Sequence, residues 1–209
     1  SRAYDANENW PDVIRIFLNE TDIVISNVGD NGYTVSDEDR HRPPSANTVP
    51  ISYPAKLLSL LVQRFEYNAN PLLLLPCELV SNNGRVLRRV LTSLAKTWGE
   101  SGAFQAWIVG SVIICDTLVD RIVSESIEPI GAVAEPYGLW AIQREPLFEP
   151  PFQHPKVTYT DNLEPLLRLK LHILNLGHTF LAEMWKAERR REDETVCKML
   201  SDPDIKQRL

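Results

Sequence analysis

The pattern that most constrains the fold is an alternation of short apolar runs with longer amphipathic stretches. The apolar runs span residues 22–28, 71–77 and 111–115, and polar, glycine or proline residues bound each of them, so we expect strands there. Helices are predicted from about Pro54 and from about Val86, because apolar residues recur at three- and four-residue steps in both stretches. Fully apolar strands that alternate with helices indicate a mainly parallel sheet covered by helices.

The second half of the chain changes character near residue 161. Extended segments are predicted at 132–142 and 157–160, with a proline-rich bend between them. From Leu163 the apolar spacing becomes helical, and it remains so through a charged tail at 186–194. We interpret that tail as a solvated helix surface. The sequence therefore predicts an α/β region followed by a mostly helical one.

Charge and cysteine content argue against several classes of function. Twenty-two Lys and Arg against 28 Asp and Glu give a net charge of −6, which disfavours a dedicated surface for nucleic acid or for an anionic membrane. The sequence has no apolar run of about 18 residues, and its first residues do not resemble a signal peptide. Cys77, Cys115 and Cys197 are odd in number and lack metal-binding spacing, so we expect reduced thiols and a cytoplasmic protein.

The stretch 166–181 combines a helical apolar pattern with three polar side chains of complementary chemistry. Lys170, Asn175 and His178 are set among leucines and isoleucine at helical spacing. At about 100° per residue, Asn175 lies about 140° around an α-helix from Lys170, and His178 about 80°, with an axial rise of about 12 Å from Lys170 to His178. A cation, an amide and an imidazole can therefore converge on one ligand. The structural alternative is an ordinary helix with polar residues at its rim.

A second polar cluster follows the third apolar run. Asp116, Asp120 and Arg121 stand where a strand of an open α/β sheet ends, and such sheets bind ligands outside the carboxyl ends of their strands. The alternative for Asp120 and Arg121 is an ion pair that closes a turn. Glu135 is equally a candidate ligand contact or a turn residue, and the 27–33 loop is a ligand contact or a plain linker.

Common catalytic signatures are missing from the sequence. It contains no Gly-x-Gly-x-x-Gly, no Walker loop, no Gly-x-Ser-x-Gly and no His-Glu-x-x-His. The four histidines are scattered without carboxylate or cysteine partners at usable spacing, so no metal site is expected. Nucleophilic catalysis by serine or cysteine has no local signature either.

Five segments in fixed order are more specific together than any of them alone. They are Ser-Asn-Val-Gly-Asp-Asn-Gly-Tyr at 26–33, Leu-Pro-Cys-Glu-Leu-Val-Ser-Asn-Asn-Gly at 75–84, Asp-Thr-Leu-Val-Asp-Arg-Ile at 116–122, Ala-Glu-Pro-Tyr at 134–137, and the spaced Lys, Asn and His of 170–178. In this order they resemble the polyol-specific long-chain dehydrogenase/reductase family. The Leu-Val-Asp-Arg-Ile element and the Lys, Asn, His set are the most diagnostic.

The resemblance implies a zinc-independent hydride transfer between NAD(P) and a carbon of a polyol or sugar acid. Carried over by position, Lys170 is the general base that takes the alcohol proton, while Asn175 and His178 hold the reacting oxygen and stabilise its developing charge. The leucines around Lys170 are expected to bring its pKa down toward about 7–8, the range suited to base catalysis. Asp116 is the fourth residue assigned to catalysis. Its negative charge is expected to raise the pKa of Lys170, opposite to the effect of the leucines.

Together with the strand-end argument, the resemblance assigns the domains and the binding residues. Residues 1–160 become the C-terminal portion of a Rossmann-like dinucleotide-binding α/β domain, and residues 161–209 the start of a helical substrate-binding domain. The residues expected to bind NAD, with NADP as the alternative, are Asn27, Val28 and Glu78, and those expected to bind substrate are Asp120, Arg121 and Glu135. The expected partner is a small sugar acid or polyol, with no nucleic acid and no membrane, and the oligomeric state stays open.

The substrate hints within the family disagree. The Pro-Cys-Glu-Leu segment resembles tagaturonate reductase, whereas Asp116, where mannitol 2-dehydrogenases carry asparagine, resembles the mannitol-1-phosphate 5-dehydrogenase branch. We favour tagaturonate/altronate chemistry, with mannitol-1-phosphate 5-dehydrogenase or mannitol 2-dehydrogenase activity as alternatives. The rival from another class is a non-catalytic interaction module that keeps the fold without the cofactor half.

The chain is expected to be a fragment of such an enzyme. Family members are longer and begin with a strand, a glycine-rich turn and a helix that bind the cofactor pyrophosphate, and this chain starts after that point. It also stops early in the helical substrate domain. We therefore expect weak cofactor binding by the chain alone, and the functional prediction concerns the protein to which the segment belongs.

Overall fold

The computed structural model describes residues 2–29, 31–129 and 131–209. It divides into two compact units, Ser1–Asp161 and Asn162–Leu209, and we describe each by itself. Asp30, part of the first family-like segment, lies outside the described residues. Within the described part, no helix is long and apolar enough to cross a membrane.

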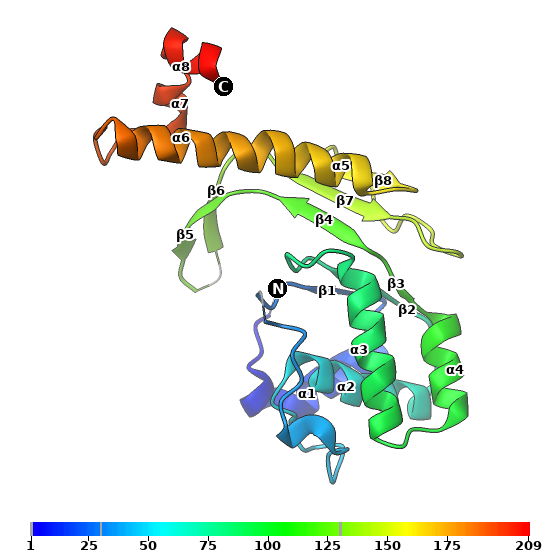
Figure 1. The fold of residues 1–209 in the computed structure, drawn as a ribbon. Coiled ribbons are helices and arrows are strands. Elements are labelled where there is room, and N and C mark those ends of the chain that lie inside the picture. Colours follow the sequence, from blue (N-terminus) through cyan, green and yellow to red (C-terminus); the bar gives the residue numbers. More distant parts are fainter. Residues whose placement is uncertain (1, 30, 130) are drawn as a thin grey trace. The chain divides into compact units, whose positions relative to one another are not determined.

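The first unit contains a three-stranded parallel sheet (Figure 1). Its strands are β1 (Ile23–Ser26), β2 (Leu72–Pro76) and β3 (Val112–Ile114), in the spatial order β1-β2-β3. Ile23 stands opposite Leu73, and Leu72 stands opposite Val112. The predicted parallel sheet is therefore confirmed, with one strand in each of the three apolar runs.

Four helices accompany this sheet, and their buried faces form its core. They are α1 (Ala6–Asn19), α2 (Tyr53–Tyr67), α3 (Asn83–Thr97) and α4 (Gly102–Ser111). The buried leucines of α2 and α3 include Leu57, Leu58, Leu61, Leu87 and Leu91. Their three- and four-residue steps keep one face of each helix toward the apolar core. In addition, α3 packs on β2 and β3, and α4 packs on β3.

Two of these helices, α1 and α4, are not among those predicted from the sequence. In α1, Pro11 lies inside the helix and Asn9 has non-helical φ and ψ angles of −121° and 26°, but Trp10, Val13, Ile14 and Phe17 keep the three- and four-residue spacing of a helix. The short helix α4 carries the contiguous run Ala-Trp-Ile-Val and leads directly into β3. An apolar run without amphipathic spacing does not distinguish a helix from a strand.

One buried carboxylate anchors the polar segment between β1 and α2. This segment contains the short 3-10 helix η1 (Glu38–Arg40), in which Asp39 is only 6% exposed. The Asp39 carboxylate accepts hydrogen bonds from the backbone N–H of Ile51 at 3.0 Å and of Ser52 at 2.6 Å. The backbone carbonyl of Asp39 accepts a third from the Trp98 indole at 2.8 Å. The segment is therefore held against the start of α2 and the end of α3.

Two smaller sheets complete the first unit. β4 (Thr117–Asp120) pairs antiparallel with β7 (Leu139–Gln143), which pairs parallel with β8 (Val157–Thr160). β5 (Val123–Ile127) and β6 (Gly131–Ala134) form a separate antiparallel pair. The single extended segment predicted at 132–142 is therefore wrong, since it belongs to two sheets. The Glu-Pro-Tyr-Gly stretch between β6 and β7 interrupts it with a proline, which lacks an N–H, and a glycine.

The second unit is helical, as the apolar spacing after Leu163 predicts. It consists of α5 (Glu164–Leu169), the π-helix η2 (Lys170–Asn175), α6 (Leu176–Ala187), α7 (Val196–Met199) and α8 (Pro203–Arg208). The small buried core of this unit comprises Leu181, Met184, Met199 and Ile205.

The charged tail at 186–194 is not the helix surface that the sequence predicts. The helix α6 ends at Ala187, and Arg189 has a positive φ of 49°, so the chain leaves the helical path there. Arg190 then contacts the carboxylates of Glu188, Glu194 and Asp202 at 2.7, 2.9 and 3.3 Å. This change of direction allows α7 to pack on α6, which a continued helix would prevent.

Candidate functional site

The carboxyl ends of β1 and β2 bring separate loops to one edge of the parallel sheet. Ser26 at the end of β1 stands opposite Pro76 at the end of β2. Segments that follow parallel strands emerge at the same edge, which is where open α/β sheets bind ligands. Two predicted cofactor-binding residues, Asn27 and Val28, are exposed just after β1, and the third, Glu78, is buried just after β2. The structure therefore places all three on neighbouring loops.

Tyr33 and Glu78 connect these two loops. The Tyr33 hydroxyl donates a 2.8 Å hydrogen bond to Glu78 Oε2, and Glu78 is only 3% exposed. Burial, together with the hydrogen bond to Glu78, raises the pKa of Tyr33, so its hydroxyl stays protonated and donates. Glu78 Oε1 has no hydrogen-bond partner among the described residues. A buried acceptor without a donor is destabilising by about 1–3 kcal/mol, so this oxygen fits a donor group of a ligand.

Asn83 is the polar centre of this edge. It is 1% exposed, and its side-chain amide donates to the carbonyls of Pro76, Glu78 and Thr117 at 3.0, 3.1 and 3.1 Å. Its Oδ1 accepts the N–H groups of Gly84 and Thr117, both at 2.9 Å. One side chain therefore fixes the loop after β2, the start of α3 and the start of β4 relative to one another.

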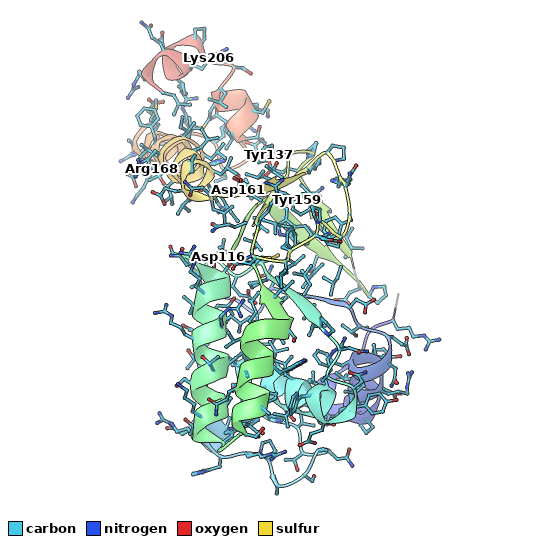
Figure 2. All side chains as sticks on the ribbon, turned by 90° about the vertical axis from the view of Figure 1, so that its right-hand side faces the viewer. Asp116, Tyr137, Tyr159, Asp161, Arg168 and Lys206 are labelled. Atoms are coloured by element: carbon cyan, nitrogen blue, oxygen red, sulfur yellow. The ribbon has the colours of Figure 1, made fainter. Side chains whose placement is uncertain are left out.

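The start of α3 is pressed against the chain that follows β3. A Cβ atom on Gly84 would lie 2.4 Å from the carbonyl oxygen of Cys115, so a larger residue does not fit without movement of the backbone. Asp116 is 2% exposed and accepts the N–H of Arg85 at 2.9 Å, and its other oxygen forms a 3.1 Å ion pair with the Arg85 guanidinium. Figure 2 shows Asp116 at this end of α3, where a negative charge is favourable. These contacts are structural, and the predicted influence of Asp116 on Lys170 stays a prediction.

Buried thiols flank this edge in their neutral form. Burial raises the pKa of Cys77 to about 11 and the pKa of Cys115 to about 12. Because the thiolate is the nucleophile in cysteine chemistry, neither side chain is activated at neutral pH. Over the residues that the structure describes, no group of three or more His, Cys, Asp or Glu side chains is placed to hold a metal ion.

The predicted substrate-binding residues lie where β4 leads into β5 and β6 leads into β7. Arg121 Nε donates to the carbonyl of Glu135 at 3.1 Å, and the N–H of Ile122 donates to the Glu135 carboxylate at 2.7 Å. Asp120 is the last residue of β4 and is half-buried. The structure therefore brings Arg121 and Glu135 together and uses the Glu135 side chain to hold two connections in place. Their role toward a substrate stays a prediction.

Lys170, Asn175 and His178 belong to the second unit, where the backbone is not the continuous α-helix that the sequence predicts. Lys170 and Asn175 are the first and last residues of η2, and the N–H of Leu176 donates to the carbonyl of Leu171, five residues earlier. In a π-turn residues five apart stack, as residues four apart do in an α-helix. Asn175 therefore stacks on Lys170, and His178, three residues along α6, lies on the same face. The angle of about 140° predicted between Lys170 and Asn175 is wrong. It assumes an α-turn, which holds one residue fewer than the π-turn that the chain forms.

The packing predicted around Lys170 is only partly present. Leu166, Leu167 and Leu174 are half-buried, but Leu169 and Ile173 are 49% and 62% exposed. Lys170 is itself half-buried, whereas the side chains of Asn175 and His178 are exposed. The amide and the imidazole are therefore accessible in this chain.

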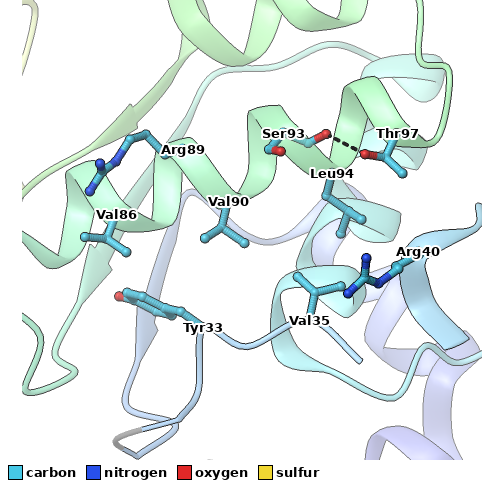
Figure 3. Close-up of a pocket in the computed structure, with 9 residues that line it drawn as sticks. All are labelled: Tyr33, Val35, Arg40, Val86, Arg89, Val90, Ser93, Leu94 and Thr97. Atoms are coloured by element: carbon cyan, nitrogen blue, oxygen red, sulfur yellow. Dashed lines mark hydrogen bonds between the residues drawn. The ribbon is translucent and has the colours of Figure 1, made fainter. Parts of the chain in front are cut away.

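A hollow of about 440 Å³ lies beside α3 in the first unit (Figure 3). Tyr33 and Val35 form one wall, and Val86, Val90 and Leu94 of α3 form the other. Among the described residues, Tyr33 is its one lining residue from the candidate 27–33 loop, and none of the residues assigned to catalysis, cofactor or substrate lines it. The polar edge of the sheet, and not this hollow, is therefore the candidate site of the first unit.

Comparison with known protein families decides the assignment of the fold. The family model described as mannitol dehydrogenase Rossmann domain matches residues 2–153. The chain belongs to this family. The β1-β2-β3 sheet is accordingly part of a mannitol dehydrogenase Rossmann domain, and both the predicted family and the predicted Rossmann-like fold are confirmed.

Three curated relatives of the chain carry the same name, altronate oxidoreductase. The altronate oxidoreductase of Halalkalibacterium halodurans is 32% identical over 203 residues, covering 87% of this chain and 39% of the relative. Those of Klebsiella pneumoniae and Bacillus subtilis are 29% and 31% identical, covering 98% and 75% of this chain and 46% and 36% of the relatives. The chain therefore spans less than half the length of these relatives.

Solved structures show the same fold. A Pseudomonas fluorescens mannitol 2-dehydrogenase in ternary complex with NAD and D-mannitol matches with a TM-score of 0.68 at 20% identity, over 83% of this chain and 40% of that one. A D-sorbitol dehydrogenase in substrate-free form matches with a TM-score of 0.68 at 17% identity, over 83% of this chain and 40% of that one. At these identities the likeness concerns the fold alone.

Sequence patterns do not single out Asn83 or Tyr33, which do much to shape the edge of this Rossmann domain. Asn83 stands in an Asn-Asn-Gly stretch that predicts a turn, and the left-handed residue there is Asn82, with a φ of 53°. The sequence feature that could have identified Asn83 is its position at the start of a predicted helix. Amide side chains there often accept hydrogen bonds from the unpaired backbone N–H groups of the first turn. No spacing rule connects Tyr33 with Glu78.

Proposed function

We propose that the protein to which this chain belongs is an NAD-dependent oxidoreductase that interconverts a sugar acid and its keto form, of the altronate/tagaturonate type. The observation that carries this proposal is the stacking of Lys170, Asn175 and His178 on one face of a helix. The names of the curated relatives support the sugar-acid class over the polyol phosphates. A cytoplasmic location agrees with the three free cysteines.

The polar edge of the first unit fits the nicotinamide end of a cofactor. We assign Asn27, Val28 and Glu78 to it, because two of them are exposed beside the ends of parallel strands and the third offers a buried acceptor, Oε1, in need of a donor. NAD, when bound, supplies the acceptor for the hydride that leaves the substrate carbon. NADP stays the alternative.

The chemistry of the second unit suits an alcohol oxygen. In the oxidation direction, Lys170 takes the hydroxyl proton onto Nζ, and it returns that proton when a ketone is reduced. Asn175 donates an amide N–H that does not titrate, and a neutral His178 offers one further donor. Donors aimed at an oxygen that becomes negative stabilise the transition state more than the ground state.

Asp120, Arg121 and Glu135 are proposed to recognise the rest of the sugar acid. The Arg121 guanidinium is exposed, and such a cation suits the substrate carboxylate. The Asp120 carboxylate can accept hydrogen bonds from sugar hydroxyls, and Glu135 holds the backbone beside Arg121 in place.

The test is an absorbance assay at the nicotinamide band with the full-length protein. The panel contains tagaturonate, altronate, fructuronate, mannitol 1-phosphate and mannitol, each with NAD(H) and with NADP(H). We expect turnover of tagaturonate and altronate well above that of the two mannitol compounds. Turnover restricted to a mannitol compound would replace the proposed substrate class. No turnover, combined with no shift of the melting temperature by NADH, would favour the interaction module instead.

A further inference from the structure

The π-turn itself calls for an explanation, because nothing local in the sequence requires it. Helix irregularities usually arise at proline, glycine or an inserted polar group; η2 itself contains neither proline nor glycine, and Pro165 and Gly177 lie outside it. The residues that flank it have ordinary helical angles, with φ and ψ of −57° and −48° at Leu169 and −64° and −42° at Leu176. The irregularity is therefore confined to η2.

Burial of apolar side chains within this chain does not explain the extra residue either. Leu171 and Ile173, both inside η2, are 46% and 62% exposed. Single π-turns inside α-helices are rare, their hydrogen bonding departs from the α-helical ladder, and they are frequent at functional sites. A function in positioning side chains is consistent with each of these observations.

We propose that the π-turn Lys170–Asn175 is the positioning element of the candidate site, and this inference rests on the proposed function. The five-residue hydrogen bond from the N–H of Leu176 to the carbonyl of Leu171 adds one residue to the turn. That residue brings Asn175 over Lys170 and aligns His178 with both. In an uninterrupted α-helix, Asn175 would lie about 140° away from Lys170, and only the long, flexible Lys170 side chain could bring the three groups to one ligand.

An engineered metal bridge measures this geometry without any reference to activity. Two histidines that stack on one helix face bind Ni²⁺ together, because imidazole is a good ligand for Ni²⁺. The test variant is Lys170→His with Asn175→His, made in the full-length protein with His172→Ala and His178→Ala so that no native imidazole contributes. The π-turn predicts that this pair binds Ni²⁺ at least about tenfold more tightly than either single histidine.

Matched pairs on the regular helix α6 serve as controls. Ala182→His with Ala187→His has the same five-residue spacing, and the α-helix there predicts no gain over the single histidines. Ala182→His with Lys186→His has a four-residue spacing, and we expect the gain to appear. If the 170/175 pair behaves like the 182/187 pair, the π-turn is absent and the inference is overturned, whatever the enzyme does with sugar acids.

Deletion of Ile173 tests whether the geometry matters for the reaction. Removing one residue from η2 should restore an α-turn, keep the far-UV circular dichroism and lower kcat on the substrate found in the panel by about 100-fold or more, as expected for misplaced catalytic groups. The control Ile173→Ala keeps the residue count and should retain kcat within about threefold. A deletion variant that folds and keeps its kcat would overturn the inference and leave the proposed function standing. If the deletion variant does not fold, the metal-bridge result decides.

Discussion

The hydroxyl of Tyr33 donates a 2.8 Å hydrogen bond to the carboxylate of Glu78 and so joins the loop after β1 to the loop after β2. Tyr33→Phe removes the donor and leaves a second oxygen of a buried carboxylate without a partner. We expect the free energy of unfolding in urea to fall by about 1–3 kcal/mol. If these loops bind the nicotinamide as we propose, the shift of melting temperature that NADH produces should shrink as well, because the two loops lose their connection.

Tyr67→Phe is the matched control for this prediction. Tyr67 is 62% exposed, and its hydroxyl donates to Asn19 at 3.2 Å. An exposed hydrogen bond is replaced by water, so we expect a change within about 0.5 kcal/mol. Equal effects of the two substitutions would show that the contact with Glu78 has no special role.

Asn83→Ala removes an amide whose two N–H groups serve three carbonyls and whose oxygen accepts two N–H groups, in a side chain that is 1% exposed. We expect a loss of about 2–4 kcal/mol of stability, since several buried backbone groups lose their partner together. Asn83→Asp should also destabilise, because a carboxylate oxygen would face carbonyl oxygens. The measurement is equilibrium unfolding, with the exposed Asn7→Ala as the control that should change little.

Gly84→Ala should weaken the packing of α3 against the chain after β3. The added Cβ would lie 2.4 Å from the Cys115 carbonyl oxygen, and overpacking of this kind is destabilising by about 1–3 kcal/mol. Gly110→Ala in α4 is the counterpart, because nothing lies within 4 Å of its new Cβ. There we expect a gain of about 0.5–1 kcal/mol from helix propensity. Melting temperatures that move the same way in both variants would contradict this account.

Stability should decline at alkaline pH through the two buried thiols. Burial raises the pKa of Cys77 from 9.0 to about 11 and the pKa of Cys115 from 9.0 to about 12. Above pH 9 the unfolded chain releases these protons while the folded chain keeps them. The stabilisation is therefore complete below pH 9 and is lost as the pH rises through the folded pKa values.

Unfolding titrations between pH 8 and 11 check this prediction. Cys115→Ala should flatten the decline of the free energy of unfolding with pH, since one of the two groups no longer titrates. Cys197→Ala, at an exposed position, should leave the slope unchanged. A slope that is the same in all three proteins would contradict the assignment.

The parallel sheet is readable from the sequence because its strands are apolar runs, and the central strand β2 (Leu72–Pro76) is buried along nearly its whole length. α1 is readable as well, since Trp10, Val13, Ile14 and Phe17 stand at helical spacing, whereas its kink at Asn9 is not. Asn83 and Tyr33 matter through partners 34 and 45 residues away, and such long-range hydrogen bonds leave no local pattern. The order of Lys170, Asn175 and His178 along the sequence is enough to identify them as a set. Their shared helix face could not be predicted, because an α-helical period was assumed where the chain forms a π-turn.

The most direct test of the central claim compares Lys170→Met with Lys206→Met in the full-length protein, by the rate of NADH formation from altronate. Both substitutions remove one ammonium group from a helix, but only Lys170 shares its helix face with Asn175 and His178. We predict that Lys170→Met lowers kcat by at least about 100-fold, as expected when a general base is lost, and that Lys206→Met retains the kcat of the unsubstituted protein. An enzyme that keeps its full rate without the Lys170 ammonium would contradict the account.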